Sequence, residues 1–181
     1  MQEEVFIIRE ASPDDAPGIA KVHIDTWRST YSGIIPDSYL EKLSYEKAEG
    51  VWRERITASE APGLIYVGEG PGGEIVGFVT GGAERTGEYP YEGEIYAIHV
   101  FKEFHNRGIG RRLTSVICQQ LILEGLHSLL IWVLKENLSR GFYEKLGGRM
   151  VAEREIEIGG VLLPEVGYVW EDIRKLSDVT T

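Results

Sequence analysis

One segment near the middle of the chain restricts the fold most, because a strand, a glycine-bearing loop and a helix follow one another there without a break. Residues 94–100 are rich in β-branched and aromatic side chains, which predicts a strand. Gly108 and Gly110 lie in the loop that follows. The helix behind them carries an apolar stripe at helical spacing, formed by Ile109, Leu113, Val116, Ile117 and Leu121. Glycines and the free N–H groups of a helix N-terminus together favour close approach by an anion.

Three arginines crowd the start of this helix, at positions 107, 111 and 112. Positive charge at a helix N-terminus opposes the helix dipole and costs a few tenths of a kcal/mol, roughly, for each residue. The crowding is unusual in a chain with 19 Lys and Arg against 29 Asp and Glu, a formal charge of −10. A bound polyanion such as a pyrophosphate would turn the penalty into attraction. The alternative is a tight turn with ordinary surface arginines.

The remaining pattern alternates short apolar runs with helical segments. Strands are expected at residues 5–8, 64–68, 75–79, 94–100, 129–133, 150–158 and 161–170. Helices are expected to begin near Ser12, Pro36, Tyr45, Ile109 and Ser139. This order predicts an α/β (α+β) fold, with a mixed, mostly antiparallel central sheet of about seven strands flanked by helices. With 181 residues, the chain is expected to form one domain, residues 1–181.

Composition removes several classes of function. The acidic balance disfavours nucleic-acid binding, because a field of that sign repels phosphate backbones. Cys118 is the single cysteine, which excludes an internal disulfide and a multi-cysteine zinc site, and no other cluster has metal-ligand spacing. No apolar run reaches the length of a membrane span, and the first four residues are acidic where a signal peptide would be basic. We therefore expect a cytoplasmic protein without a metal and without a membrane partner.

Two blocks of sequence resemble the GNAT superfamily of acetyl-CoA-dependent N-acetyltransferases. The family's cofactor motif, [QR]-x-x-G-x-[GA] between a strand and a helix, is matched by His105 to Gly110, with His105 where Gln or Arg is usual. A second family pattern, N-x-x-[AS]-x-x-F-Y-x-K-x-G, is matched by Asn137 to Gly147. The similarity in order and spacing runs from about residue 7 to residue 170. It implies the GNAT fold, acetyl-CoA as co-substrate and an amine as acceptor.

The resemblance also implies roles for individual residues. Backbone groups of Ile98, His99 and Val100 would hold the acetyl carbonyl and the pantetheine arm. Asn137 and Ser139 would contact the pantetheine, and Tyr143 would face the sulfur and protonate the departing thiolate. His105 would contact the cofactor through its side chain. The cradle for the pyrophosphate would be formed by the backbone N–H groups of Asn106, Arg107, Gly108, Ile109, Gly110 and Arg111.

The reaction also needs a base, because a neutral amine must attack the thioester. Glu94 heads the central strand and is the best candidate from the sequence, acting through water; the alternative is a solvated carboxylate at a strand end. Tyr143 has a competing interpretation as a core aromatic residue. His23 and His99 could also serve as bases, although an isolated histidine is more often structural.

The acceptor side has a weaker signal. Trp27 and Tyr31 are four residues apart on one helical face and could flank a cationic amine, or could instead pack against Trp52. The leading interpretation is an N-acetyltransferase acting on a small primary amine such as a polyamine or amino sugar. The alternatives are a protein N-terminus or lysine as acceptor, and an acyl-CoA-binding module without turnover. A homodimer is expected by analogy with the fold.

Overall fold

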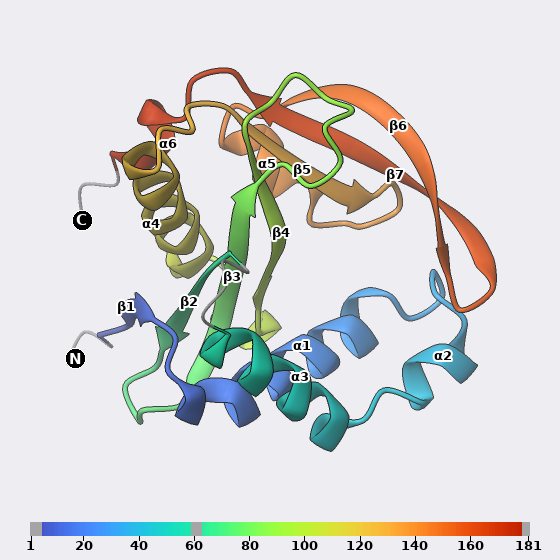
Figure 1. The fold of residues 1–181 in the computed structure, drawn as a ribbon. Coiled ribbons are helices and arrows are strands. Elements are labelled where there is room, and N and C mark those ends of the chain that lie inside the picture. Colours follow the sequence, from blue (N-terminus) through green and yellow to red (C-terminus); the bar gives the residue numbers. More distant parts are fainter. Residues whose placement is uncertain (1–4, 59–62, 179–181) are drawn as a thin grey trace.

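A seven-stranded sheet forms the centre of the computed structural model, which describes residues 5–58 and 63–178 (Figure 1). Its strands are β1 (Ile7–Glu10), β2 (Leu64–Glu69), β3 (Ile75–Ala83), β4 (Gly93–Val100), β5 (Leu129–Leu134), β6 (Arg149–Ile158) and β7 (Val161–Trp170). Their order is β1-β2-β3-β4-β5-β7-β6, and every pair is antiparallel except β4 and β5. The predicted mixed, mostly antiparallel sheet is confirmed. The acidic start of the chain, Met1 to Glu4, and Pro62 lie outside the described residues.

Helices cover both faces of the sheet. One face carries α1 (Ala16–Thr30) and α3 (Tyr45–Thr57), with α2 (Asp37–Glu41) beside them. The other carries α4 (Ile109–Leu123), α5 (Arg140–Lys145) and the short α6 (Arg174–Ser177). The apolar stripe predicted for α4 is buried against the sheet, which fixes this helix and the loop before it. No helix within the described residues combines the length and apolar character that a bilayer crossing needs.

The sheet opens between its two parallel strands. β4 and β5 pair only over Gly93–Ile95 and Leu129–Ile131, although both strands continue further. At Tyr96 the register of β4 against β3 shifts by one residue, because Thr80 faces Ala97 whereas Gly81 faces Ile95. A bulge of this kind bends its strand away from the regular ladder. We call the divergence of β4 and β5 beyond Ile95 and Ile131 the fork.

Two details differ from the sequence prediction. The first strand lies at Ile7–Glu10 rather than at residues 5–8, so that Arg9 of β1 reaches the carboxylates of Asp15 and Glu69 at 2.7 and 2.8 Å. Asp15 also accepts hydrogen bonds from Ser12 and ends a 3₁₀ turn that precedes α1. The helix α6 was not expected, since four residues are too few for a periodic pattern. Its position is fixed by the carbonyl of Ser177, which accepts hydrogen bonds from Ser115 and Gln119 of α4.

Candidate active site

The loop between β4 and α4 curls back on the end of its strand. The ring of His105 donates a hydrogen bond from Nε2 to the carbonyl oxygen of Val100 at 2.9 Å. Asn106 and Gly108 then adopt left-handed backbone conformations, with φ of 61° and 79°. Gly108 has this conformation at the position just before α4, where glycine adopts it without steric cost. His105, which departs from the family's usual Gln or Arg, therefore closes the loop.

The same loop presents a row of backbone donors. Among the residues that the structure describes, the N–H groups of Gly108, Ile109, Gly110 and Arg111 have no hydrogen-bond acceptor, and Arg112 makes the first helical bond, to Gly108 at 3.0 Å. Four converging N–H groups at the positive end of a fifteen-residue helix favour an anionic group. The backbone here fits the phosphate groups that the sequence motif predicts.

The three arginines near the start of α4 make different contacts. Arg112 donates from Nη1 to the backbone oxygen of Phe6 at 2.8 Å. The guanidinium of Arg107 lies 5.5 Å from the ring centre of Phe104 and 5.9 Å from that of Phe6. Arg111 is exposed and has no hydrogen bond or ion pair to the described part of the chain. Arg112 and Arg107 therefore both contact Phe6, beside β1, and Arg107 and Arg111 are exposed.

Gly110, in the first motif segment, packs against Phe142, in the second. A Cβ atom at this position would lie 3.3 Å from the ring of Phe142, closer than most real Cβ contacts. The missing side chain thus lets α5 pack on the first turn of α4. Gly108 differs, since a Cβ there would meet nothing within 4 Å in the chain itself.

Tyr143 lies on α5 at the inner side of this packing. Its side chain is buried, with 8% exposure, against the rings of Phe142 and Tyr168. Burial raises the pKa of its phenol, so the hydroxyl is protonated at neutral pH and is a weaker acid than a free phenol. Tyr143 is therefore a core residue whose hydroxyl carries a proton, and its role as the general acid stays a prediction.

Asn137 connects the end of β5 to α1. Its Oδ1 accepts from the backbone N–H of Ser139 at 2.8 Å, and its Nδ2 donates to the hydroxyl of Tyr31 at 3.3 Å. Sequence reasoning placed Tyr31 against the acceptor and Asn137 against the cofactor. The structure brings the two side chains together, and Tyr31 is itself buried.

An aromatic stripe of three residues, His23, Trp27 and Tyr31, runs along α1. Successive rings meet edge to face, with centroid distances of 5.5 and 5.3 Å. At one end His23 stacks on His99 of β4, and at the other Tyr31 reaches Asn137 beyond β5. The stripe therefore runs from the β4 side of the fork to the β5 side. The expected alternative was packing of Trp27 and Tyr31 on Trp52. The residue of the stripe that contacts Trp52 is instead His23, whose Nδ1 accepts from the indole N–H of Trp52 at 3.3 Å.

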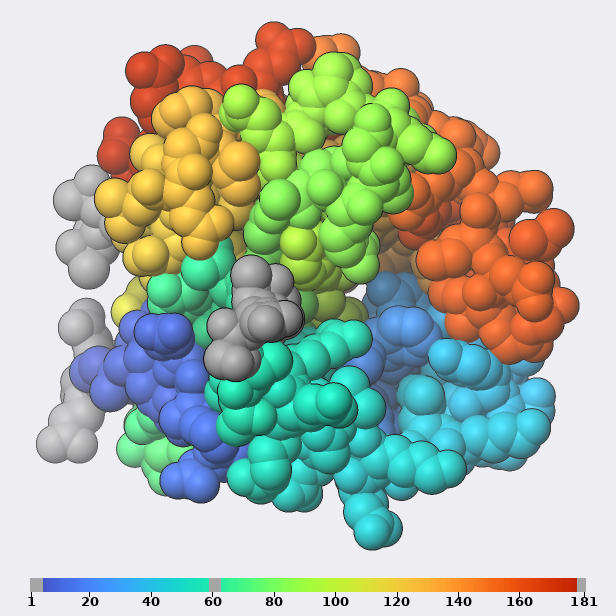
Figure 2. Space-filling model, in the orientation of Figure 1, coloured from blue at the N-terminus to red at the C-terminus, as the bar shows by residue number. Residues whose placement is uncertain are grey.

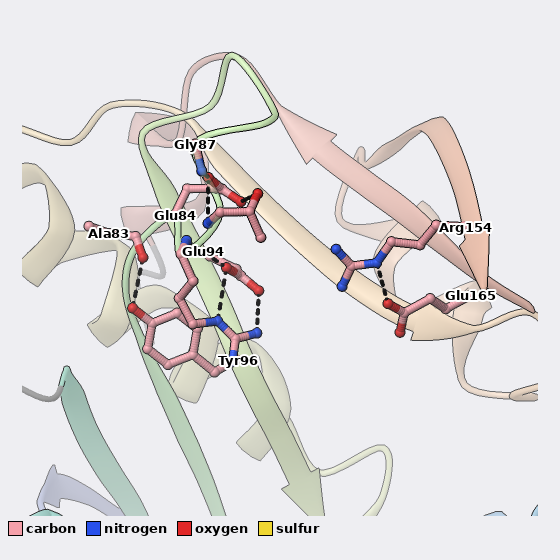
Figure 3. Close-up of polar contacts among 9 residues, drawn as sticks. Ala83, Glu84, Gly87, Glu94, Tyr96, Arg154 and Glu165 are labelled. Atoms are coloured by element: carbon pink, nitrogen blue, oxygen red, sulfur yellow. Dashed lines mark hydrogen bonds and ion pairs between the residues drawn. The ribbon is translucent and has the colours of Figure 1, made fainter. Parts of the chain in front are cut away.

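Glu94 is buried at the start of β4, with 2% exposure, and is not a solvated strand-end carboxylate. Its two carboxylate oxygens accept hydrogen bonds from Arg85, at 2.5 Å from Nη2 and 3.1 Å from Nε (Figure 3). The guanidinium of Arg85 also lies over the ring of Tyr96, at 4.3 Å from its centre. The fork begins just beyond this ion pair along β4.

Sequence reasoning missed a second ion pair of the same design on the β6–β7 hairpin. Arg154 donates to the buried carboxylate of Glu165 at 2.5 Å (Figure 3). Its guanidinium lies 3.9 Å from the ring centre of Trp132. Figure 2 shows a recess between the loop at residues 84–92, the β6–β7 hairpin and helices α1 and α3. Within the described ranges, no group of three His, Cys, Asp or Glu side chains is arranged to hold a metal ion.

Known proteins are similar to this chain in sequence. The family model for FR47-like proteins matches residues 79–156. The uncharacterized N-acetyltransferase YuaI of Bacillus subtilis is 38% identical over 94% of this chain and 95% of its own. The probable N-acetyltransferase Rv2775 of Mycobacterium tuberculosis is 28% identical over 89% of this chain and 91% of its own.

Solved structures share the fold. PaiA N-acetyltransferase from Thermoplasma acidophilum, in complex with coenzyme A, matches with a TM-score of 0.71 and 20% identity, over 89% of this chain and 98% of its own. A putative acetyltransferase, yncA from Salmonella typhimurium with its cofactor acetyl-CoA, matches with a TM-score of 0.69 and 17% identity. The match covers 98% of this chain and 96% of its own.

The relatives that match over nearly the whole chain are N-acetyltransferases by name, and the forked sheet and the N–H groups at the start of α4 are compatible with an acyltransferase of this class. The chain belongs to the GNAT superfamily of acetyl-CoA-dependent N-acetyltransferases, as the two sequence blocks predicted.

Proposed function

We propose that this protein transfers the acetyl group of acetyl-CoA to a primary amine of a small molecule, by direct attack of the amine on the thioester. The observation that carries the proposal is the row of N–H groups at the start of α4 that have no acceptor within the described residues, beside a sheet that opens between β4 and β5. A pyrophosphate on the cradle would direct the pantetheine arm along the fork. The coenzyme A bound to the PaiA relative supports this choice of co-substrate.

The cofactor contacts follow from the motif positions. Backbone N–H groups from Asn106 to Arg111 would hold the pyrophosphate. The strand segment from Ile98 to Val100, which lies beyond the pairing with β5, would hold the pantetheine and the acetyl carbonyl. Asn137 and Ser139 would line the arm from the β5 side. The Tyr31 hydroxyl fixes one end of the Asn137 amide and the Ser139 N–H fixes the other, so its orientation is set before the cofactor arrives.

The chemistry then needs two proton transfers. As the C–N bond forms, the C–S bond breaks and its electron pair stays on sulfur, where Tyr143 would supply a proton. Glu94 would act on the incoming amine through water, or would attract its ammonium form. Trp27, which is partly exposed in the middle of the aromatic stripe, would contact the acceptor. The cytoplasmic location and the homodimer expected from the sequence stay predictions.

The experiment that tests this function follows the release of free CoA from acetyl-CoA. Spermidine, glucosamine and an alanine tripeptide would serve as acceptors, each compared with hydrolysis in buffer alone. We expect turnover with a small amine. A preference for the tripeptide would indicate a protein acetyltransferase, and acetyl-CoA binding without turnover for any acceptor would indicate a non-catalytic binding module.

A further inference from the structure

His99 lies on the part of β4 that borders the fork. It stands between Ile98 and Val100, four residues beyond Ile95, where pairing with β5 ends. Its ring lies on the α1 side of the sheet, stacked on His23 at 5.9 Å and tilted against Phe78 of β3 at 5.5 Å. The side chain therefore comes from the strand segment proposed to hold the acetyl group, and from the face that carries the aromatic stripe.

The ring nitrogens of His99 differ from those of its neighbours. In the part of the chain that the structure describes, neither nitrogen has a hydrogen-bond partner, and the residue is partly exposed. His23 has its Nδ1 engaged by Trp52, and His105 has its Nε2 engaged by Val100. Because the rings of His23 and His99 are stacked, with 27° between their planes, they do not hydrogen-bond to each other. A lone pair on His99 is thus available to a ligand.

The surroundings keep this imidazole uncharged. Among the residues that the structure describes, the charged or titratable groups that act on the pair are each other and Arg55 of α3, whose guanidinium lies 5.1 Å from the ring centre of Trp52. Burial and the neighbouring His23 lower the pKa of His99 to about 3, and burial and Arg55 lower that of His23 to about 4. At neutral pH both rings are therefore neutral and neither repels a cationic amine, but each is a weaker base than free imidazole, so only a nitrogen made acidic by its attack on the acetyl group can pass a proton to His99.

We propose that His99 accepts the proton of the attacking amine, an assignment that rests on the proposed function. As the amine nitrogen bonds to the acetyl carbon it becomes positively charged and acidic, and a nitrogen of His99 takes its proton. The C–S electron pair leaves with sulfur, which is protonated by Tyr143. Return of one proton from the imidazolium to the tyrosinate through solvent restores both groups, so that amine and acetyl-CoA yield amide and CoA.

Glu94 is less well placed for this step. It lies five residues earlier on β4, roughly 16 Å along an extended strand, and both its oxygens are already bound by Arg85. The imidazole, by contrast, belongs to a residue whose own backbone borders the expected acetyl position. The proton acceptor and the acetyl site are then fixed by one short segment of one strand.

Chemical rescue tests the assignment. We expect His99→Ala to lower kcat roughly 10²-fold, to leave acetyl-CoA affinity within a factor of about two, and to regain much of the loss when imidazole is added. His99→Phe keeps an aromatic ring beside Phe78 but has no lone pair, so it should be as slow as His99→Ala. His127→Ala is the matched control, because that histidine is exposed on the α4–β5 connection; it should keep full activity and show no response to imidazole.

Three results would overturn the proposal. One is a kcat within a factor of about two of wild type in the folded His99→Ala protein. Another is recovery of wild-type rate in His99→Phe, which would show that the ring only packs. The third is a slow His99→Ala protein, with native acetyl-CoA affinity, that imidazole does not accelerate. A wild-type protein that releases no CoA with any amine would overturn the proposed function itself, and this inference with it.

Discussion

The cofactor side of the fork presents backbone groups to its expected ligand, whereas the acceptor side presents side chains. On the cofactor side, the groups that face the expected ligand are backbone N–H groups from one stretch of chain, Gly108 to Arg111. On the acceptor side they are rings and ion pairs contributed by α1, β4 and the β6–β7 hairpin. A site made of backbone depends on local conformation and tolerates many side chains. A site made of side chains depends on how distant segments pack, so it can change its ligand without a change of fold.

The largest expected effect concerns Tyr143, the proposed general acid. Tyr143→Phe removes the hydroxyl and keeps the ring, so we predict unchanged acetyl-CoA affinity and a kcat roughly 10²-fold lower. Calorimetry and steady-state rates would measure the two quantities. Tyr168→Phe is the matched control, since its ring lies 5.8 Å from that of Tyr143 and its hydroxyl donates to Glu144. Equal losses of kcat in both variants would mean that the aromatic cluster matters only for packing.

The next effect isolates the backbone cradle. Gly108 and Gly125 lie at opposite ends of α4 with φ of 79° and 84°, and a Cβ at either would meet nothing within 4 Å. Alanine at each should therefore lower the unfolding free energy by a similar amount, about 1–2 kcal/mol. Only at Gly108 would the added methyl group also occupy space needed by the phosphates, so we predict about tenfold weaker CoA binding for that variant alone. Denaturant unfolding and calorimetry on both variants would measure this difference.

Equal affinity of the two variants for CoA would place the pyrophosphate elsewhere. Gly110 is unsuitable for the same test, because a side chain there would meet the ring of Phe142 and disturb the packing of α5.

The contrast between the two sides also explains what the sequence could predict. The sheet, the helix α4 and both motif blocks were foreseen because each has a local pattern of glycines, apolar spacing or turn residues. The contacts of Arg112 with Phe6 and of Asn137 with Tyr31 each join residues 106 positions apart, and no local pattern encodes them. Arg112 was assigned to the phosphate site because the sequence shows its charge but does not show that it binds the backbone oxygen of Phe6.

The two buried ion pairs could not be predicted from a local sequence pattern either. Glu94 read as a strand-end carboxylate, since nothing in the sequence showed that Arg85 would fold back across nine residues to hold it. Arg154 and Glu165 lie on two strands of one hairpin and meet only because of its register. Charge in a sequence therefore marks candidate sites, whereas packing decides which charges are left for a ligand.

A third prediction compares these two pairs. Glu94→Gln and Glu165→Gln each remove a buried charge that binds an arginine stacked on an aromatic ring. Both should lower the unfolding free energy, by about 1–3 kcal/mol. For Glu94→Gln we further expect an amine KM about threefold higher with kcat nearly unchanged, the effect of losing a weak electrostatic attraction. A fall in kcat that is largest below the pKa of the amine would instead identify Glu94 as the end of a proton relay.

The smallest effect concerns charge on the cofactor side. Arg111 is exposed beside the cradle and has no ion pair within the described residues, so it can approach the phosphates of CoA without losing another contact. Exposed charge pairs contribute under about 1 kcal/mol, and salt screens them over a distance of about 10 Å at 0.1 M. Arg111→Ala should therefore weaken CoA binding about threefold at low salt and flatten the dependence of log Kd on log ionic strength.

The control for this last measurement is Arg112→Ala, next to Arg111 on the same turn of α4. Its guanidinium is held by the carbonyl oxygen of Phe6, so its loss should lower thermal stability and leave the salt dependence of CoA binding as it is in the wild type. If Arg112→Ala flattens the salt dependence as much as Arg111→Ala, then Arg112 leaves Phe6 when CoA binds, and the cofactor side uses side-chain charge more than the geometry of the free protein indicates. If neither variant changes it, the cradle binds the pyrophosphate through backbone groups alone, and the contrast between the two sides of the fork is complete.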